Sequence, residues 1–113
     1  MTTPRLGLDE LAQNQSQPHV AVNAALRRID VLVQSTAIEF ITVLPGSYAD
    51  GDVYIAASAG VTGPLVGKED YVVYYYGGWN YIAPFRGMKF FMLDSEDDYR
   101  YDDTGSPVGW LPV

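Results

Sequence analysis

A change in hydrophobic spacing near residue 35 constrains the fold of this chain more than any other feature. Apolar residues first recur at spacings of four, three and four, at Val22, Leu26, Ile29 and Val33. That spacing places them on one face of an α-helix. From Thr36 onward the sequence is rich in β-branched residues that alternate with others, as in a strand. We therefore predict an α+β domain, with a helix over residues 19–34 followed by a sheet.

The helical stripe has two possible partners. Ala25 and Leu32 widen it, whereas Arg27, Arg28 and Asp30 fall on the opposite side. The stripe can pack on the sheet of its own chain or on that of a neighbour, and the sequence leaves this choice open.

Short strands separated by turn residues occupy the rest of the chain. The expected strands are 36–43, 52–57, 71–76, 79–84, 88–93 and 108–113, with a further short one at 99–101. We predict that they form one antiparallel sheet of five or six short strands. Residues 88–93 are apolar at nearly every position, which predicts a strand covered on both faces.

The strongest β signal is a hairpin around Gly77-Gly78. Two consecutive glycines suit a two-residue turn with positive φ angles. This turn predicts three cross-strand pairs, Tyr76 with Trp79, Tyr74 with Tyr81, and Val72 with Ala83. The four aromatic residues of these pairs would share one face of the hairpin. The other face would carry Tyr71, Val73, Tyr75, Asn80 and Ile82, and a slip of one residue would exchange the faces.

Composition excludes several classes of function. The net charge of −7 disfavours nucleic-acid binding. There is no cysteine, His19 is the only histidine, and no apolar run approaches the roughly 20 residues needed to insert into a membrane. No nucleophile elbow or phosphate-binding loop is present. We therefore expect a non-enzymatic protein without cofactor or metal, made in the cytoplasm.

Two polar features have competing interpretations. His19 could serve as a metal ligand or pH switch, but a locally hydrogen-bonded side chain near the first turn of the helix is favoured. The acidic stretch 94–98 could hold Ca²⁺ through oxygen ligands, but it lacks the spacing of an EF-hand, so a solvated loop is favoured. Asp97 and Asp98 are adjacent in the sequence and are therefore a poor pair for glycoside hydrolysis.

Several segments resemble a known family. They are Gln13–Val20, Asn23–Asp30, Asp50–Ile55, Gly77–Pro84 and Gly109-Trp110. Together with Leu6-Gly7-Leu8 they resemble an uncharacterised domain family of tailed bacteriophages, prophages and gene transfer agents. That family typically opens with a Gln-rich, Gln-Lys-His-Val-like segment followed by Asn-x-Ala-Leu-x-x-Leu-Asp. This chain departs from the family at Pro18, where Lys is usual, and at Met88 and Phe90, where the family often has Trp.

The resemblance implies a virion component, a head fibre or spike or a tail fibre, that mediates assembly or host attachment. It implies other virion proteins as partners and a homo-oligomer, with a trimer as the leading expectation because phage fibres usually have threefold symmetry. Residues 1–18 then form an N-terminal docking segment and residues 19–113 a single helix-plus-sheet domain. The expected docking residues are Leu6, Leu8, Leu11, Gln15, Gln17 and His19.

The aromatic residues support an alternative function, a carbohydrate-binding module that recognises a host surface glycan. The candidate binding residues are Tyr74, Tyr76, Trp79, Tyr81 and Trp110. Aromatic rings dominate contacts with sugars and with protein partners. They equally suit the core of the sheet, packed on the helix. Since a small sheet cannot easily bury aromatic rings on both hairpin faces, we expect one face to meet a ligand or a partner.

Overall fold

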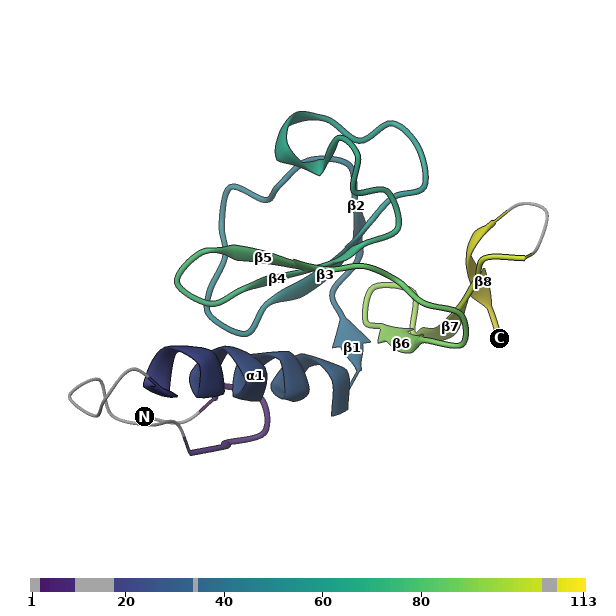
Figure 1. The fold of residues 1–113 in the computed structure, drawn as a ribbon. Helices are drawn as coiled ribbons and strands as arrows, with labels where there is room; N and C mark the ends of the chain where they lie inside the picture. The colour runs from purple at the N-terminus through teal and green to yellow at the C-terminus, as the bar shows by residue number, and fades with distance from the viewer. Residues whose placement is uncertain (1–2, 10–17, 34, 105–107) are drawn as a thin grey trace. The chain divides into compact units, whose positions relative to one another are not determined.

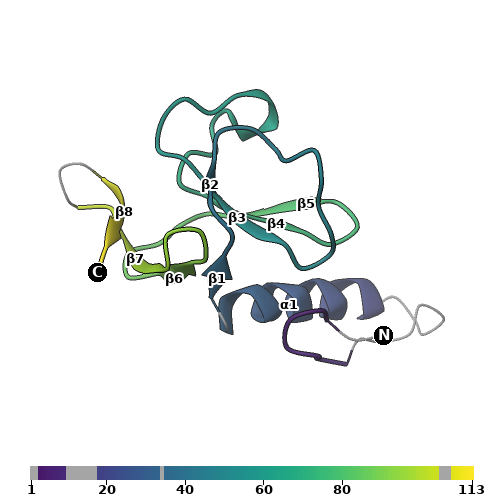
Figure 2. The same ribbon diagram turned by 180° about the vertical axis from the view of Figure 1, so that it is seen from behind.

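The chain divides into two compact units, residues 1–35 and 36–113. The computed structural model describes residues 3–9, 18–33, 35–104 and 108–113 (Figure 1, and from behind in Figure 2). The helix thus groups with the residues that precede it, whereas the sequence suggested a boundary after residue 18. Whether residues 1–18 dock onto another protein stays a prediction.

The first unit contains one described helix, α1 (Pro18–Val33). The predicted helix is confirmed, beginning one residue earlier than expected. Pro18 suits this position, since its fixed φ angle is helical and the first turn needs no backbone N–H from it. Residue 34, the predicted end, lies outside the described residues.

A buried carboxylate holds the N-terminal turn against α1. Asp30 has no exposed surface. Its Oδ1 accepts hydrogen bonds from the Thr3 hydroxyl at 2.7 Å and from the Leu6 backbone N–H at 2.6 Å. Its Oδ2 accepts one from the Arg5 backbone N–H at 3.2 Å. The Thr3 oxygen in turn accepts the N–H of Leu8 at 3.0 Å. One side chain of the helix therefore fixes the course of residues 3–8.

The apolar stripe of α1 is largely exposed. Val22 is 40% exposed, Ile29 45% and Val33 61%. Asn23 and Asp30, on another side of the helix, are buried. Within the first unit, the stripe is therefore not the side of the helix that packs. The buried side is chosen instead by the donors of the N-terminal turn, which converge on Asp30.

The second unit is built from strands. Those described are β1 (Thr36–Ala37), β2 (Phe40–Ile41), β3 (Val53–Ala56), β4 (Val72–Tyr75), β5 (Trp79–Ile82), β6 (Lys89–Met92), β7 (Asp97–Asp102) and β8 (Gly109–Pro112), with a 3-10 turn η1 (Gly63–Leu65). They form two four-stranded sheets, in the orders β1-β6-β7-β8 and β2-β3-β4-β5. The α+β class is confirmed, but the single antiparallel sheet is wrong. Each sheet is mixed, because β1 pairs parallel with β6 and β2 parallel with β3.

Within the expected strand 36–43 the chain instead passes from one sheet to the other. The Ile38 N–H donates to the carbonyl of Val53, the first residue of β3, at 2.7 Å. The Ile38 carbonyl accepts from the N–H of Asp94, just after β6, at 3.1 Å. The backbone of one residue therefore bonds to both sheets, and a continuous strand is split into β1 and β2.

The core of the second unit surrounds β3, whose four residues are all buried. Tyr54 and Ala56 belong to a cluster completed by Ile41, Leu65 and Val73. Val53 and Ile55 point to the other face of the sheet, because side chains alternate along a strand. In the other sheet, β6 alternates between exposed Lys89 and buried Phe90. The prediction that 88–93 is covered on both faces is therefore wrong.

A polar junction ties β8 to the loop that precedes β4. The Trp110 indole N–H donates to the carbonyl of Asp70 at 2.8 Å. Asp70 is buried, has a φ of +69°, and accepts the Ser58 hydroxyl at 2.5 Å. Gly109 has a φ of +146°, and a Cβ at this position would lie 3.0 Å from the Ser58 oxygen. The junction therefore requires glycine for both its conformation and its space.

The Asp30 network gives the first prediction. An Asp30→Asn substitution replaces one acceptor oxygen by an amide that cannot accept the buried donors. We expect it to lower the free energy of unfolding of the first unit by about 2 to 3 kcal/mol. Urea titration followed by helical circular dichroism measures the loss. The control is Asp98→Asn, at an exposed carboxylate, and equal midpoints for the two variants would contradict the proposed role of Asp30.

Candidate functional site

The β4–β5 hairpin decides which aromatic residues share a face. Tyr75 pairs with Trp79, Tyr74 with Asn80, and Val73 with Tyr81. The predicted pairs are wrong by one residue, because the loop contains three residues, Tyr76–Gly78, and is closed by the Tyr76 N–H donating to the Gly78 carbonyl at 2.9 Å. Residues that pair directly lie on the same face of a sheet. Tyr75, Trp79 and Tyr81 therefore share one face, and Tyr74 lies on the other.

On this face the rings form a continuous surface, which we call the Trp79 surface. It consists of Tyr48, Tyr75, Trp79 and Tyr81. The Trp79 ring lies 5.1 Å from that of Tyr48 and 5.1 Å from that of Tyr75, both edge to face. The Tyr48 and Tyr75 rings are 4.4 Å apart. These contacts restrict the orientation of the Tyr48, Tyr75 and Trp79 rings before any ligand arrives. Tyr81 lies two residues further along β5, on the same face, and packs on the core.

One side of the Trp79 surface packs on the core of the unit, and the other side is partly exposed to solvent. Trp79 and Tyr81 pack against the buried cluster around Tyr54 and Val73. Both rings remain half-buried, and Tyr48 is 46% exposed. Burial, and then the charges of Asp52 and Glu39, raise the pKa of the Tyr54 hydroxyl. The phenol of Tyr54 therefore stays protonated, and the surface can offer aromatic faces, polar ring edges and no ionised phenolate from Tyr54.

The structure separates the other predicted binding residues from this surface. Tyr74 and Tyr76 are buried, with rings 5.9 Å apart. Trp110 is 8% exposed and packs edge to face on Phe90 at 5.8 Å. The ring and N–H of Trp110 are thus used within the fold. Of the five predicted ligand-binding residues, only Trp79 and Tyr81 lie on the Trp79 surface.

Sequence reasoning missed two members of the surface. Tyr75 was assigned to the opposite face, and only the length of the turn distinguishes the two registers. Tyr48 lies in the loop between β2 and β3, where strand periodicity gives no information. In both views this loop runs beside the β4–β5 hairpin (Figures 1 and 2). The Gly77 N–H donates to Asp50 at 2.9 Å and joins the loop to the hairpin tip.

The expected docking residues are described only in part. Leu6 and Leu8 are half-buried in the turn held by Asp30. Leu11, Gln15 and Gln17 lie outside the described residues. His19 lies in the first turn of α1, and its side chain also lies outside the description. The docking role of these residues stays a prediction.

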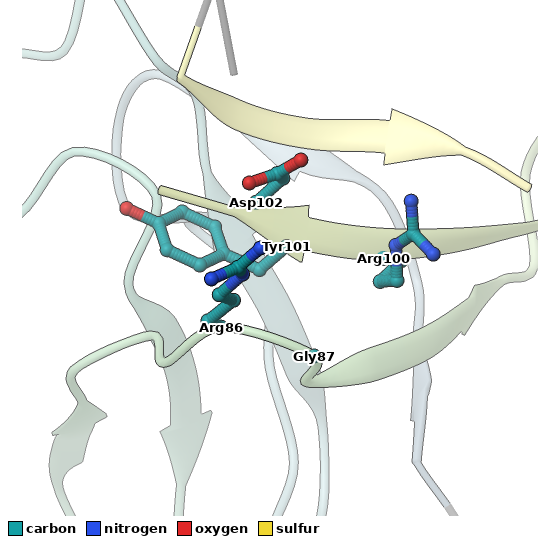
Figure 3. Close-up of a pocket in the computed structure, with 5 residues that line it drawn as sticks. All are labelled: Arg86, Gly87, Arg100, Tyr101 and Asp102. Carbon is teal, nitrogen blue, oxygen red and sulfur yellow. The ribbon is translucent and has the colours of Figure 1, made fainter. Parts of the chain in front are cut away.

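A shallow polar pocket opens on the other sheet. It has a volume of about 200 Å³ and is lined by Arg86, Gly87, Arg100, Tyr101 and Asp102. Figure 3 shows Arg86 beside the Tyr101 ring, with Arg100 further along β7. Lys89 stands directly opposite Arg100 in the ladder, and two cations so placed repel each other. The carboxylate of Asp102 offsets part of this charge, so we regard the pocket as a solvated polar surface.

Hydrogen bonds and charge both act on Asp102. Its Oδ1 accepts the backbone N–H of Thr104 at 2.9 Å and the Thr104 hydroxyl at 2.7 Å. These bonds, and then the charges of Arg86 and Arg100, lower the pKa of the Asp102 carboxyl. On the same strand, burial, followed by the charges of Asp70 and Asp103, raises the pKa of the neighbouring Tyr101. At neutral pH the pocket therefore presents one ionised carboxylate and a neutral phenol.

No three His, Cys, Asp or Glu side chains among the described residues are grouped to hold a metal ion. No described helix is long and apolar enough to cross a membrane.

Thr104 gives the second prediction. A Thr104→Val substitution removes the hydroxyl donor but keeps the backbone N–H, so the pKa of Asp102 should rise part of the way to its ordinary value. Since the native pKa is lowered, the bonds stabilise the fold above the ordinary pKa of aspartate, and this effect is lost as the pH falls through the native value. Carbon NMR of the carboxyl group measures the shift. Thr62→Val, on another loop, should leave the pKa of Asp102 unchanged. If Asp102 has the same pKa in the Thr104→Val variant as in the wild type, the Thr104 hydroxyl does not lower that pKa.

Comparison with known proteins places the chain in a family without assigning an activity. A search of curated proteins found no match. The model of a family described as "Protein of unknown function (DUF2793)" matches residues 22–106. The match begins within α1, includes the whole Trp79 surface and ends before β8. The chain therefore belongs to the DUF2793 family of proteins of unknown function.

Proposed function

We propose that this chain is a non-enzymatic structural protein of bacteriophage virions, a head fibre, spike or tail-fibre component that assembles through α1. The motifs of residues 13–30 support the connection with phages. The exposed apolar stripe of α1 carries the proposal of assembly. In this function the chain is made in the host bacterial cytoplasm, and its partners are copies of itself and other virion proteins.

The stripe has the spacing of a coiled-coil seam. Steps of four, three and four place Val22 and Ile29 at d positions and Leu26 and Val33 at a positions of a heptad. Leucine at a with isoleucine at d favours three or four strands over two. The N-terminal turn covers the neighbouring side of the helix at Asp30, so the seam is the side left open. A trimer is therefore the assembly that we propose.

The third prediction tests this seam. Ile29→Glu places a charge in the centre of the helical bundle and should raise the dissociation constant of the oligomer by at least about 30-fold, the equivalent of ~2 kcal/mol. Arg28→Glu introduces the same residue at an adjacent exposed position and should leave the oligomer intact. Native mass spectrometry measures both, with circular dichroism to check the fold.

The same two variants can be tested for incorporation into virus particles. Mass spectrometry of purified virions from the encoding genome should find the wild-type and Arg28→Glu chains and little of the Ile29→Glu chain. A wild-type chain absent from particles overturns the virion role. A monomeric wild-type chain, or an Ile29→Glu chain that is destabilised without any change in assembly, overturns the proposed seam.

The Trp79 surface favours a second function, the binding of a host surface glycan. Half-exposed rings in fixed orientation can stack on the apolar C–H faces of sugar rings, and Trp79 occupies the middle of the surface. This function is compatible with the first, because a fibre or spike can also attach to its host. The binding residues are then Tyr48, Tyr75, Trp79 and Tyr81, in place of the buried Tyr74, Tyr76 and Trp110.

The fourth prediction is that Trp79→Ala weakens binding to extracted host polysaccharide at least about tenfold, because it removes the central stacking ring. Phe85→Ala truncates an aromatic residue that is 58% exposed and does not belong to the Trp79 surface, and it should have no effect on binding. Isothermal titration calorimetry compares the two. Equal affinities for both variants would rule out glycan binding at this surface.

A further inference from the structure

One end of the Trp79 surface carries a cation that is held by aromatic rings. The Lys68 Nζ lies 5.0 Å from the ring centre of Tyr81 and 5.4 Å from that of Tyr71. Its backbone is fixed as well, since the Lys68 N–H donates to Leu65 at 2.8 Å and the Lys68 carbonyl accepts from Tyr71 at 3.1 Å. The ammonium group is therefore positioned before a ligand arrives.

The charge of Lys68 is not neutralised by the carboxylates next to it in the sequence. Glu69 accepts the N–H of Gly67 at 3.2 Å, and the Asp70 carboxylate accepts the Ser58 hydroxyl. Within the part of the chain that the structure describes, Lys68 forms no ion pair. Contact with ring faces orients an ammonium group but leaves its positive charge available to an anion.

The opposite end of the surface is negative. Asp50 bonds the hairpin tip at Gly77, and Asp52 accepts the N–H of Ala49 at 2.9 Å. Both carboxylates therefore lie near the Tyr48 end, whereas Lys68 lies beside Tyr81. An anionic ligand is attracted to one end and repelled from the other, so the surface discriminates between orientations.

We infer that the Trp79 surface binds a sugar that carries a carboxylate, such as a uronic acid residue of a polysaccharide. This inference rests on the second proposed function. The pyranose ring stacks on Trp79, and its carboxylate pairs with the Lys68 ammonium. Trp79 and Tyr81 are two residues apart on one strand, about 7 Å, so the cation beside Tyr81 lies roughly one sugar ring from the stacking site. The hydroxyl groups at the far end face Asp50 and Asp52, which accept hydrogen bonds.

The fifth prediction compares matched ligands. Uronate-containing oligosaccharides and their carboxyl-reduced neutral counterparts are titrated into the full chain by calorimetry. The wild-type chain should bind the acidic member at least about tenfold more tightly at low salt, and 0.5 M NaCl should reduce this preference because the ion pair is partly exposed. Lys68→Met keeps the apolar stem and should lose the preference, while Lys68→Arg restores it. Lys89→Met, a lysine on β6, is the matched control and should retain it.

The outcomes separate this inference from the function on which it rests. Binding of both members with equal affinity overturns the inference and leaves glycan binding in place. A preference for the acid that survives in Lys68→Met also overturns it. Failure of both members of every pair to bind overturns the inference and glycan binding together, and the Trp79 surface is then a contact for another protein. Thermal unfolding of each variant checks that the fold is retained.

Discussion

The second unit depends on the backbone of one residue, Ile38, which bonds to both sheets. Its N–H belongs to the ladder with β3, and its carbonyl accepts from the residue just beyond β6. Since a backbone group that is buried without a partner is costly, moving either sheet away would leave one of these groups unsatisfied. The Phe40 and Tyr99 rings, 5.1 Å apart and edge to face, add a side-chain contact between the same two sheets. The separation of the strands into two sheets follows from this transition.

The junction at Asp70 connects the two sheets at a second point. β8 is a terminal strand of its sheet, and it is held by the Trp110 N–H and by the close approach of Gly109 to Ser58. This explains why Trp110 and Trp79 have different roles despite similar surroundings in the sequence. The Trp110 ring completes the core, whereas the Trp79 ring covers a core cluster and keeps one side open. With two fixed connections between its sheets, the unit can present the Trp79 surface in a constant shape.

The two proposed surfaces lie on different units and serve different purposes. The seam on α1 is aliphatic, is arranged along a helix, and suits copies of the same helix. The Trp79 surface is aromatic, carries a positive charge at one end and negative charges at the other, and suits a polar ligand with a stacking face. In the proposed function, the first surface assembles the protein and the second attaches it to the host. The N-terminal turn links the first surface to folding, because Asp30 orders residues 3–8 and leaves the seam open.

Much of the secondary structure was determined by the sequence alone. Hydrophobic spacing placed α1 to within one residue, and β-branched and aromatic runs located β3, β4, β5, β6 and β8, because these patterns depend on local propensity. Only the tertiary structure decided which sides of these elements are buried. Within the first unit, the side of α1 that carries Asp30 is buried because Asp30 binds the N-terminal turn, and the apolar stripe is not. Trp79 and Tyr81 share a face with Tyr75 instead of with Tyr74 and Tyr76, because one additional loop residue shifts the register of β4 against β5. Tyr48 and Lys68 join the candidate site through loops whose course depends on distant contacts, and no local spacing in the sequence encodes such contacts.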